Sequence, residues 1–266
     1  MTSDLMLKLN LLKENIKNYG SVAVAFSGGV DSTLLLRVAH DVLQDQAVAV
    51  TVSTCAFPKR ELEEAVSFCQ KEDIRQIILD IDVLSVDGFV NNPSDRCYWC
   101  KKKIFSEIIR VARAHQLNAV FEGSNMDDVQ DYRPGSKAVM ELGVISPLRD
   151  VQLYKSEIRW LSDEYKLPTY NKPSFACLAT RFVYGERITK EKLEMVEKAE
   201  QVLYELGFSQ FRVRLHDKLA RIEILPDEFD KMMRCRNEIV SRFKSFGFGY
   251  IALDLQGYRT GSMNVF

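Results

Sequence analysis

The chain has 266 residues, of which 46% are apolar and 27% are charged, a composition typical of a globular protein with one large domain or two. Its net charge of −1 gives no strong electrostatic footprint for nucleic acid, so we disfavour a nucleic-acid partner, and only a local basic patch stays open. No apolar run approaches the roughly 20 residues of a membrane helix, so we expect no membrane partner.

The first expected helix, residues 4–18, is amphipathic, with Leu5, Leu9, Leu12 and Ile16 on one stripe. It has no continuous apolar segment and no cleavage site, so we expect no signal peptide and a cytoplasmic location. Six cysteines in a chain of this kind favour free thiols or ligands over a disulfide framework.

Strands alternate with helices over the first half of the chain. Short apolar or β-branched runs predict strands at residues 21–26, 47–52, 75–79 and 119–121. Helical spacing predicts helices at residues 31–44, 59–71 and 101–114. This alternation predicts an α/β fold with a doubly wound parallel sheet, whose ligands bind at the carboxyl ends of the strands.

The pattern changes in the second half. Residues 129–147 look irregular, with a turn at 131–135, and a helix at 154–165 precedes a long loop over 167–185. The last expected elements are helices at 189–206 and 227–246, a hairpin of strands 211–215 and 219–225, and a strand at 250–255. We therefore expect an α/β domain over residues 1–186 and a smaller α+β domain over residues 187–266.

A small, glycine-rich and hydroxyl-rich turn, Ser27-Gly-Gly-Val-Asp-Ser32, follows the first expected strand and precedes a helix that Asp31 or Ser32 could cap. Such a unit aims unpaired N–H groups and a positive helix end at one point, which suits phosphate. It lacks the Lys of a Walker loop. It resembles the PP-loop of the ATP pyrophosphatases, which cut ATP between its α and β phosphates. An ordinary strand–helix turn is the alternative.

This resemblance implies an adenine nucleotide α-hydrolase-like fold and a set of nucleotide-binding positions. The positions expected to hold the ATP phosphates are Ser27, Gly28, Gly29, Ser32 and Thr33. Asp31 and Asp128 are the expected Mg²⁺ ligands. Ser53 and Gly123, with Thr51 as a further candidate, follow or end strands and complete the expected ATP site; for the strand-end hydroxyls, a structural role is the alternative.

Three cysteines stand apart from the others. Cys97 and Cys100 form a C-x-x-C pair just before an expected helix, whose N-terminus favours thiolate, and Cys177 lies in the long loop near Arg181. Three thiolates without a nearby His leave a fourth position open, which suits a [4Fe–4S] cluster better than structural zinc. A redox pair or two buried thiols are the alternatives. We expect Cys55, Cys69 and Cys235 to be packing residues.

Arg212 and Arg214 alternate on one expected strand, so both belong to the same face of the sheet. Two guanidiniums there would form a fork for a phosphate monoester, and Arg221 across the hairpin could join them. A solvated strand face is the alternative.

Four segments together resemble the LarE-type sulfur transferases: PSFACLATRFVYGERIT, DYRPG, RVRLHDKLARIEI and GYRTGSMN. The resemblance implies an enzyme that uses ATP and Mg²⁺ to adenylate a carboxylate of a pyridinium dicarboxylate mononucleotide. The carboxylate then becomes a thiocarboxylate during synthesis of the nickel-pincer nucleotide of lactate racemase. It also implies a substrate phosphate held by Arg181, Arg212 and Arg214, and a homo-oligomer, a hexamer in known members.

The resemblance leaves the sulfur donor open between two branches. In one branch, a single Cys at the position of Cys177 gives up its own sulfur in one turnover. The additional Cys97 and Cys100 resemble instead the members in which three cysteines hold a [4Fe–4S] cluster. A tRNA thiolase with the same loop and a non-catalytic nucleotide-binding regulator are the alternative functions.

Overall fold

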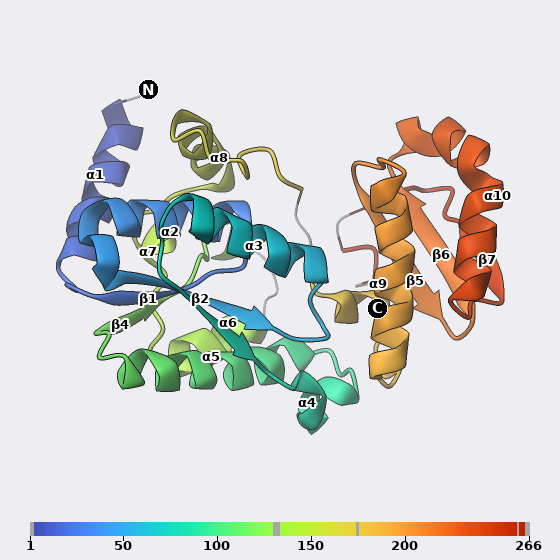
Figure 1. Ribbon diagram of the computed structural model, residues 1–266, viewed down its shortest axis with the longest axis horizontal. Coiled ribbons are helices and arrows are strands. Elements are labelled where there is room, and N and C mark those ends of the chain that lie inside the picture. Colours follow the sequence, from blue (N-terminus) through green and yellow to red (C-terminus); the bar gives the residue numbers. More distant parts are fainter. Residues whose placement is uncertain (1–2, 130–133, 174–175, 260, 264–266) are drawn as a thin grey trace. The chain divides into compact units, whose positions relative to one another are not determined.

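The computed structural model describes residues 3–129, 134–173, 176–259 and 261–263 (Figure 1). Its contacts divide the chain into two compact units. The first comprises Met1–Val86 and Asp95–Ser174, and the second comprises Asp87–Ser94 and Phe175–Phe266. The sequence places a boundary after residue 186 instead, and the limits of independently folding domains stay a prediction.

A four-stranded sheet forms the centre of the first unit. Its strands are β1 (Val22–Ala25), β2 (Ala47–Ser53), β3 (Gln76–Asp80) and β4 (Ala119–Phe121). They lie in the order β3-β2-β1-β4, and every pair is parallel. The predicted α/β fold with a parallel sheet is therefore confirmed. Strands β1 and β2 are almost completely buried, as expected for apolar runs covered on both faces.

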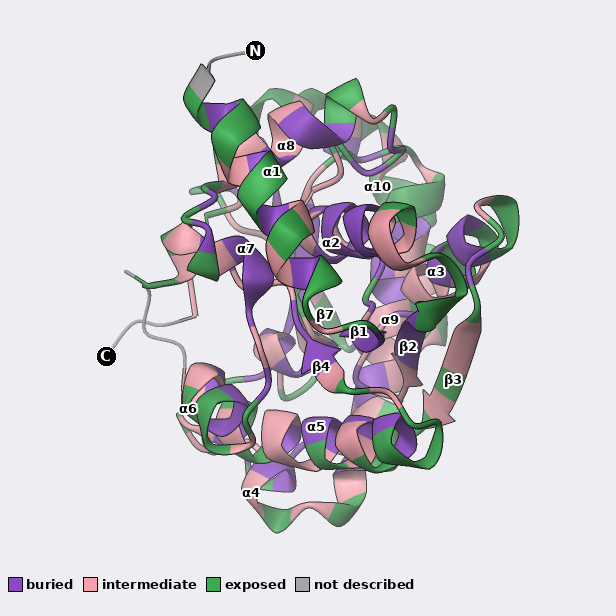
Figure 2. Cartoon of the chain, turned by 90° about the vertical axis from the view of Figure 1, so that its left-hand side faces the viewer, coloured by how far each residue is buried: buried purple, intermediate pink, exposed green. Residues whose placement is uncertain are grey.

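Helices cover both faces of this sheet (Figures 1 and 2). Those of the first unit are α1 (Ser3–Lys17), α2 (Val30–Leu43), α3 (Lys59–Lys71), α5 (Arg96–Ala114), α6 (Pro134–Glu141), α7 (Pro147–Asp150) and α8 (Lys155–Glu164). Helices α2 and α3 lie over one face and α5 lies over the other. Helix α1 packs against α2 through the predicted stripe of Leu5, Leu9, Leu12 and Ile16, all buried in the core.

Three local predictions about this unit were wrong. Helix α2 begins at Val30 with Gly29 as its N-cap, so neither Asp31 nor Ser32 caps it. Helix α5 begins at Arg96, so the cysteine pair lies inside the helix, with Cys97 in its first turn and Cys100 in its second. Helices α6 and α7 occupy part of the segment expected to be irregular, because each begins with a proline, which is tolerated at the first helical position. Residues 131–133 of the expected turn lie outside the described residues, and Pro134 and Gly135 belong to α6.

The second unit is a smaller α+β structure. Its strands are β5 (Phe211–His216), β6 (Leu219–Ile224) and β7 (Tyr250–Leu253), and its helices are α4 (Asp87–Val90), α9 (Lys190–Glu205) and α10 (Phe229–Ser245). The predicted antiparallel hairpin of β5 and β6 is confirmed, and β7 pairs parallel with β6. Helices α9 and α10 pack against each other and against this sheet.

Among the described residues, no helix combines the length and the apolar character that crossing a lipid bilayer requires.

The stripe on α1 generates a prediction about stability. Leu12 is 0% exposed, whereas its neighbour Leu11 is 49% exposed. We expect Leu12→Ala to cost about 2–5 kcal/mol, because it removes buried methyl groups and leaves a cavity. Leu11→Ala is the matched control and should cost roughly 0.5 kcal/mol or less. The measurement is urea unfolding followed by circular dichroism, and equal midpoints for the two variants would contradict the assigned face of α1.

Candidate functional site

The candidate site lies at the carboxyl ends of β1 and β4. Strand β1 is paired with both β2 and β4, with Val24 opposite Phe121, so the loops that follow β1 and β4 are neighbours. The strand order reverses between β1 and β4, and open α/β sheets bind ligands at such a point, outside the carboxyl ends of the strands. The predicted PP-loop and the segment 122–128 both begin here.

The two glycines of the loop have different surroundings. Gly28 has φ +70°, and a Cβ there would meet the Cβ of Ala65 at 3.4 Å and the carbonyl of Glu61 at 3.5 Å. Gly28 therefore needs its freedom for the turn and for its approach to α3. Gly29 has φ −82°, and among the described residues a Cβ there would meet only Ser27 Oγ within 4 Å, its chain neighbours aside. The space beside Gly29 is thus open to an approaching ligand.

Hydroxyl groups stabilise the turn from within. Ser27 Oγ and Ser32 Oγ lie 3.1 Å apart, and Ser32 Oγ donates to the carbonyl of Gly29 at 3.2 Å. Thr33 is fully buried, and its hydroxyl donates to the same carbonyl at 2.8 Å. Ser27 is exposed. Hence Ser27 can offer its hydroxyl to a ligand directly, whereas Thr33 uses its hydroxyl inside α2.

Asp31 is held from two directions. Its Oδ1 accepts from Asn125 Nδ2 at 3.1 Å, and its Oδ2 forms an ion pair with the ammonium of Lys155 at the start of α8. The backbone N–H of Asn125 donates to Asp128 Oδ2 at 3.0 Å. Asn125 therefore links the two predicted Mg²⁺ ligands. Sequence reasoning missed Asn125 and Lys155. Lys155 follows Asp31 by 124 positions, so no local signal could reveal this pair.

The other predicted positions of the ATP site are close-packed or bonded. A Cβ at Gly123 would meet the backbone N of Ser32 at 3.1 Å and Asp31 Cβ at 3.3 Å. Gly123 therefore allows the loop after β4 to pack on the first turn of α2. The Thr51 hydroxyl accepts from Gln76 Nε2 at 2.8 Å, and the backbone carbonyl of Ser53 accepts from Ile81 N at 2.9 Å. An adenosine pocket at these strand ends stays a prediction.

The three cysteines belong to different units. Cys97 is exposed and Cys100 is buried, and their spacing places them one turn apart on α5 in the first unit. Cys177 lies in the second unit and caps a short 3-10 helix, with Sγ accepting from Ala179 N at 3.4 Å. In the part of the chain that the structure describes, no three His, Cys, Asp or Glu side chains gather as a metal site. The three-thiolate site stays a prediction.

Cys69 differs from these residues. It is buried on α3, and burial raises the pKa of its thiol to about 12. Such a thiol is unreactive at neutral pH, in agreement with the expected packing role.

Buried arginines occupy the second unit. Arg181 is fully buried and forms a bidentate pair with Glu200, at 2.8 and 2.9 Å. Arg214 is 5% exposed and pairs with the fully buried Glu223 at 2.7 and 3.0 Å. Arg212 is 3% exposed and lies over the ring of Tyr258, 5.1 Å from its centroid. A solvated strand face, the alternative left open by the sequence, is therefore wrong.

Sequence analysis also missed the carboxylates of Glu200 and Glu223, although the sequence pattern around each one indicates burial. Glu200 continues the apolar stripe of Leu193, Val196 and Leu203 on α9, and Glu223 lies between apolar residues of β6. Complete burial by itself raises the pKa of Glu200, but Arg181 and Arg212 outweigh burial and hold this pKa below its ordinary value. Such a carboxylate stays charged and serves as a fixed partner for the guanidiniums.

Among the described residues, Arg212 is the third buried guanidinium of this cluster, beside Arg181 and Arg214. Burial and the neighbouring charge of Arg181 lower the pKa of Arg212 to about 10. Arg212 still carries its proton at neutral pH, so the cluster brings together three charged guanidinium groups. A phosphate bound by this cluster stays a prediction.

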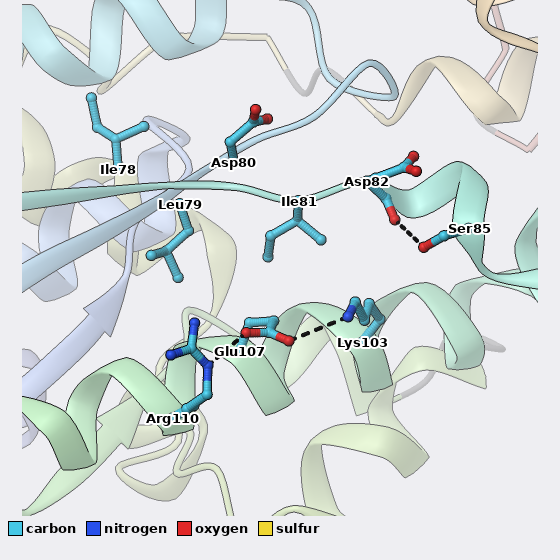
Figure 3. Close-up of a pocket in the computed structure, with 9 residues that line it drawn as sticks. All are labelled: Ile78, Leu79, Asp80, Ile81, Asp82, Ser85, Lys103, Glu107 and Arg110. Carbon is cyan, nitrogen blue, oxygen red and sulfur yellow. Dashed lines mark hydrogen bonds and ion pairs between the residues drawn. The ribbon is translucent and has the colours of Figure 1, made fainter.

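A polar cleft of about 330 Å³ lies elsewhere in the first unit, between the end of β3 and helix α5 (Figure 3). Glu107 accepts from both Lys103 and Arg110 on the helix side of this cleft. None of the residues that line it is a predicted site residue.

Comparison with known proteins connects this geometry to a family. A family model described as NAD synthase matches residues 5–95. The chain is 40% identical over 259 residues to an uncharacterized protein of Synechocystis sp., with 97% of each chain covered. It is 30% identical over 256 residues to an uncharacterized protein of Methanocaldococcus jannaschii, covering 96% of this chain and 97% of the other.

A third relative carries a functional name. The chain is 36% identical over 250 residues to the pyridinium-3,5-bisthiocarboxylic acid mononucleotide synthase of Lactiplantibacillus plantarum, covering 94% of this chain and 91% of the other. Similarity at this level extends through both compact units, far beyond the glycine-rich turn. The chain therefore belongs to the LarE-type family of ATP-dependent sulfur transferases, within the PP-loop superfamily.

Proposed function

We propose that the chain adenylates a carboxylate of a pyridinium dicarboxylate mononucleotide and converts it into a thiocarboxylate. The observation that carries this proposal is the loop after β1, where open space beside Gly29 lies close to an Asp31 held by Asn125 and Lys155. The similarity to the named synthase supports the choice of substrate.

The expected chemistry has two steps. A carboxylate oxygen of the substrate attacks the α phosphorus of ATP, and pyrophosphate leaves from that phosphorus. A sulfur nucleophile then attacks the carboxyl carbon of the acyl adenylate, and AMP leaves with the oxygen that had attacked. AMP is a far better leaving group than oxide, and this makes the exchange of oxygen for sulfur feasible.

The loop residues Ser27, Gly28 and Gly29, with Ser32 and Thr33 shaping the turn from within, would hold the pyrophosphate part of ATP. Backbone N–H groups at a helix N-terminus favour such an anion. Asp31 and Asp128 offer the carboxylate oxygens that Mg²⁺ prefers, and both lie next to Asn125. Magnesium bound there would neutralise phosphate charge during the first step.

The cluster of Arg181, Arg212 and Arg214 would hold the phosphate of the mononucleotide. The presence of three buried guanidiniums in one cluster supports this role, since guanidinium groups bind phosphate through charge-assisted hydrogen bonds. Glu200 and Glu223 would keep the other two guanidiniums in fixed positions.

For the sulfur, we extend the proposal to Cys97, Cys100 and Cys177. The first two fit one half of a thiolate site, because they lie one turn apart at a helix N-terminus, and the third comes from the other unit. A [4Fe–4S] cluster on these three residues would supply an iron with an open position for sulfur from an external donor. The sacrificial use of Cys177 alone is the alternative. The homo-oligomer and the cytoplasmic location stay predictions.

The loop generates the first test of this function. We expect Gly29→Val to abolish AMP formation, because the side chain would fill the space that phosphate needs, while φ −82° lets the variant fold. Asp31→Ala should have the same effect through loss of Mg²⁺. Asp41→Ala, on the same helix, is the control and should form AMP normally. Wild-type AMP formation by folded Gly29→Val would refute the loop assignment.

The arginine cluster generates the second test. We expect Arg212→Met to raise the apparent constant for the mononucleotide tenfold or more, since a lost charge-assisted contact costs about 1.5–3 kcal/mol. The affinity for ATP should not change. Arg212 suits the test better than Arg214, whose loss would remove one of the two guanidiniums, with that of Arg221, that pair with the fully buried Glu223.

The control for this experiment is Arg242→Ala, which removes a more exposed guanidinium of the same unit. Isothermal titration with the mononucleotide and with ATP measures both affinities. Unchanged mononucleotide binding by Arg212→Met would remove the cluster from the substrate site.

The cysteines generate the third test. Protein purified without oxygen should be brown and carry about four irons per chain. Changing Cys97, Cys100 or Cys177 singly to Ala should lose the iron, whereas Cys235→Ala, a packing position, should keep it. With sulfide supplied, wild type should form more than one thiocarboxylate per chain.

Mass spectrometry distinguishes a cluster-dependent enzyme from one that sacrifices the sulfur of Cys177. A sacrificial enzyme would be colourless, turn over once and become about 34 Da lighter as Cys177 loses H₂S. It would also work without Cys97 and Cys100. That combination would overturn the cluster while leaving the adenylation chemistry in place.

A further inference from the structure

A lysine from far along the chain reaches the PP-loop. Lys172 follows α8, and its ammonium donates to the carbonyl of Gly28 at 3.1 Å, to Glu61 Oε2 at 2.7 Å and to Glu64 Oε2 at 2.6 Å. The Lys172 side chain is only 12% exposed. Three acceptors match the three protons of an ammonium group, so the cation is fully satisfied in this position.

The backbone that carries Lys172 is itself fixed. Arg159 on α8 donates to the carbonyls of Tyr170 and Lys172 at 2.7 and 2.9 Å. The N–H of Lys172 donates to the carbonyl of Thr169 at 3.0 Å. The ammonium therefore extends from an anchored turn.

The hydrogen bond from Lys172 to the carbonyl of Gly28 also fixes the direction of the next backbone N–H, that of Gly29. The carbonyl of Gly28 and the N–H of Gly29 belong to the same planar trans peptide, so they point in opposite directions. Lys172 holds this carbonyl beside α3, and the N–H of Gly29 is thereby directed away from Lys172. On the Cβ side of Gly29, Ser27 Oγ is the one atom of the described residues within 4 Å, the chain neighbours aside, so this side is open.

The charge of Lys172 also matters for an anionic ligand. Glu61 and Glu64 bring two carboxylates to within hydrogen-bond distance of an ammonium that also touches the loop. Without Lys172, their charge would repel a triphosphate approaching Gly28 and Gly29.

We infer that Lys172 is a positioning residue of the nucleotide site, which orients the Gly28–Gly29 peptide for the pyrophosphate part of ATP and screens Glu61 and Glu64 from it. The inference rests on the proposed function, because it takes the loop to bind that part of ATP. Lys172 acts through the loop and needs no contact with the reacting atoms.

The test measures binding of ATP, pyrophosphate and AMP by isothermal titration in the presence of Mg²⁺. We expect Lys172→Met to weaken ATP and pyrophosphate about tenfold or more, the loss expected of a charge-assisted hydrogen bond, while AMP, which lacks the pyrophosphate part, binds as before. Lys172→Arg, which keeps the charge and donors, should regain most of the affinity. Lys71→Met removes an exposed lysine of α3 and is the matched control.

Pyrophosphate binding by Lys172→Met at the wild-type affinity would overturn the inference. An equal loss for AMP would also overturn it, because it would indicate general damage and no specific effect on the loop. If Lys172→Met does not fold, Lys172→Gln keeps a donor for Gly28 and must show the same selectivity among the three ligands. Failure of wild type to bind ATP, or normal ATP binding by Gly29→Val, would instead refute the proposed function.

Discussion

Parallel pairing of β1 with β2 on one side and β4 on the other is the constraint on which the candidate site depends. It brings the loop after β1 next to the loop after β4, although almost 100 residues of chain separate them. Gly123 permits their close approach, since a Cβ there would lie only 3.1 Å from the backbone N of Ser32 in the first turn of α2. The side-chain amide of Asn125 in the second loop then donates to Asp31 beside the first. The proposed nucleotide site at this edge depends on the sheet order and on this close approach.

Ion pairs join charged side chains of little exposure in both units. Lys155 compensates Asp31, and Lys172 compensates Glu61 and Glu64. In the second unit, Glu200 and Glu223 compensate two of three buried guanidiniums. Arg212 lies beside them, and burial and the charge of Arg181 lower its pKa. Charge pairing thus stabilises the loop of the proposed nucleotide site and the arginine cluster of the proposed phosphate site.

The sequence predicted what depends on periodicity and missed what depends on distant contacts. Strands β1 to β4 and the β5–β6 hairpin follow from apolar runs and alternation, and the glycine-rich turn has a recognisable spacing. Helices α6 and α7 were missed because a proline at a helix start resembles a proline in a turn. Lys155 and Lys172 were missed because nothing near them in the chain signals a partner more than 100 residues away. Glu200 was recoverable as a charged residue on an apolar stripe.

The large sequence separation between the glycine-rich turn and its partners Lys155 and Lys172 has a consequence for how the chain folds. The turn after β1 is local, but its ammonium partners follow 124 and 144 residues later in the chain. Contacts of such high sequence separation form only after the intervening chain has lost much of its conformational entropy. During synthesis, which proceeds from the N-terminus, the sheet strands emerge long before Lys172. The glycine-rich turn is therefore among the first segments made and among the last to reach its final electrostatic environment.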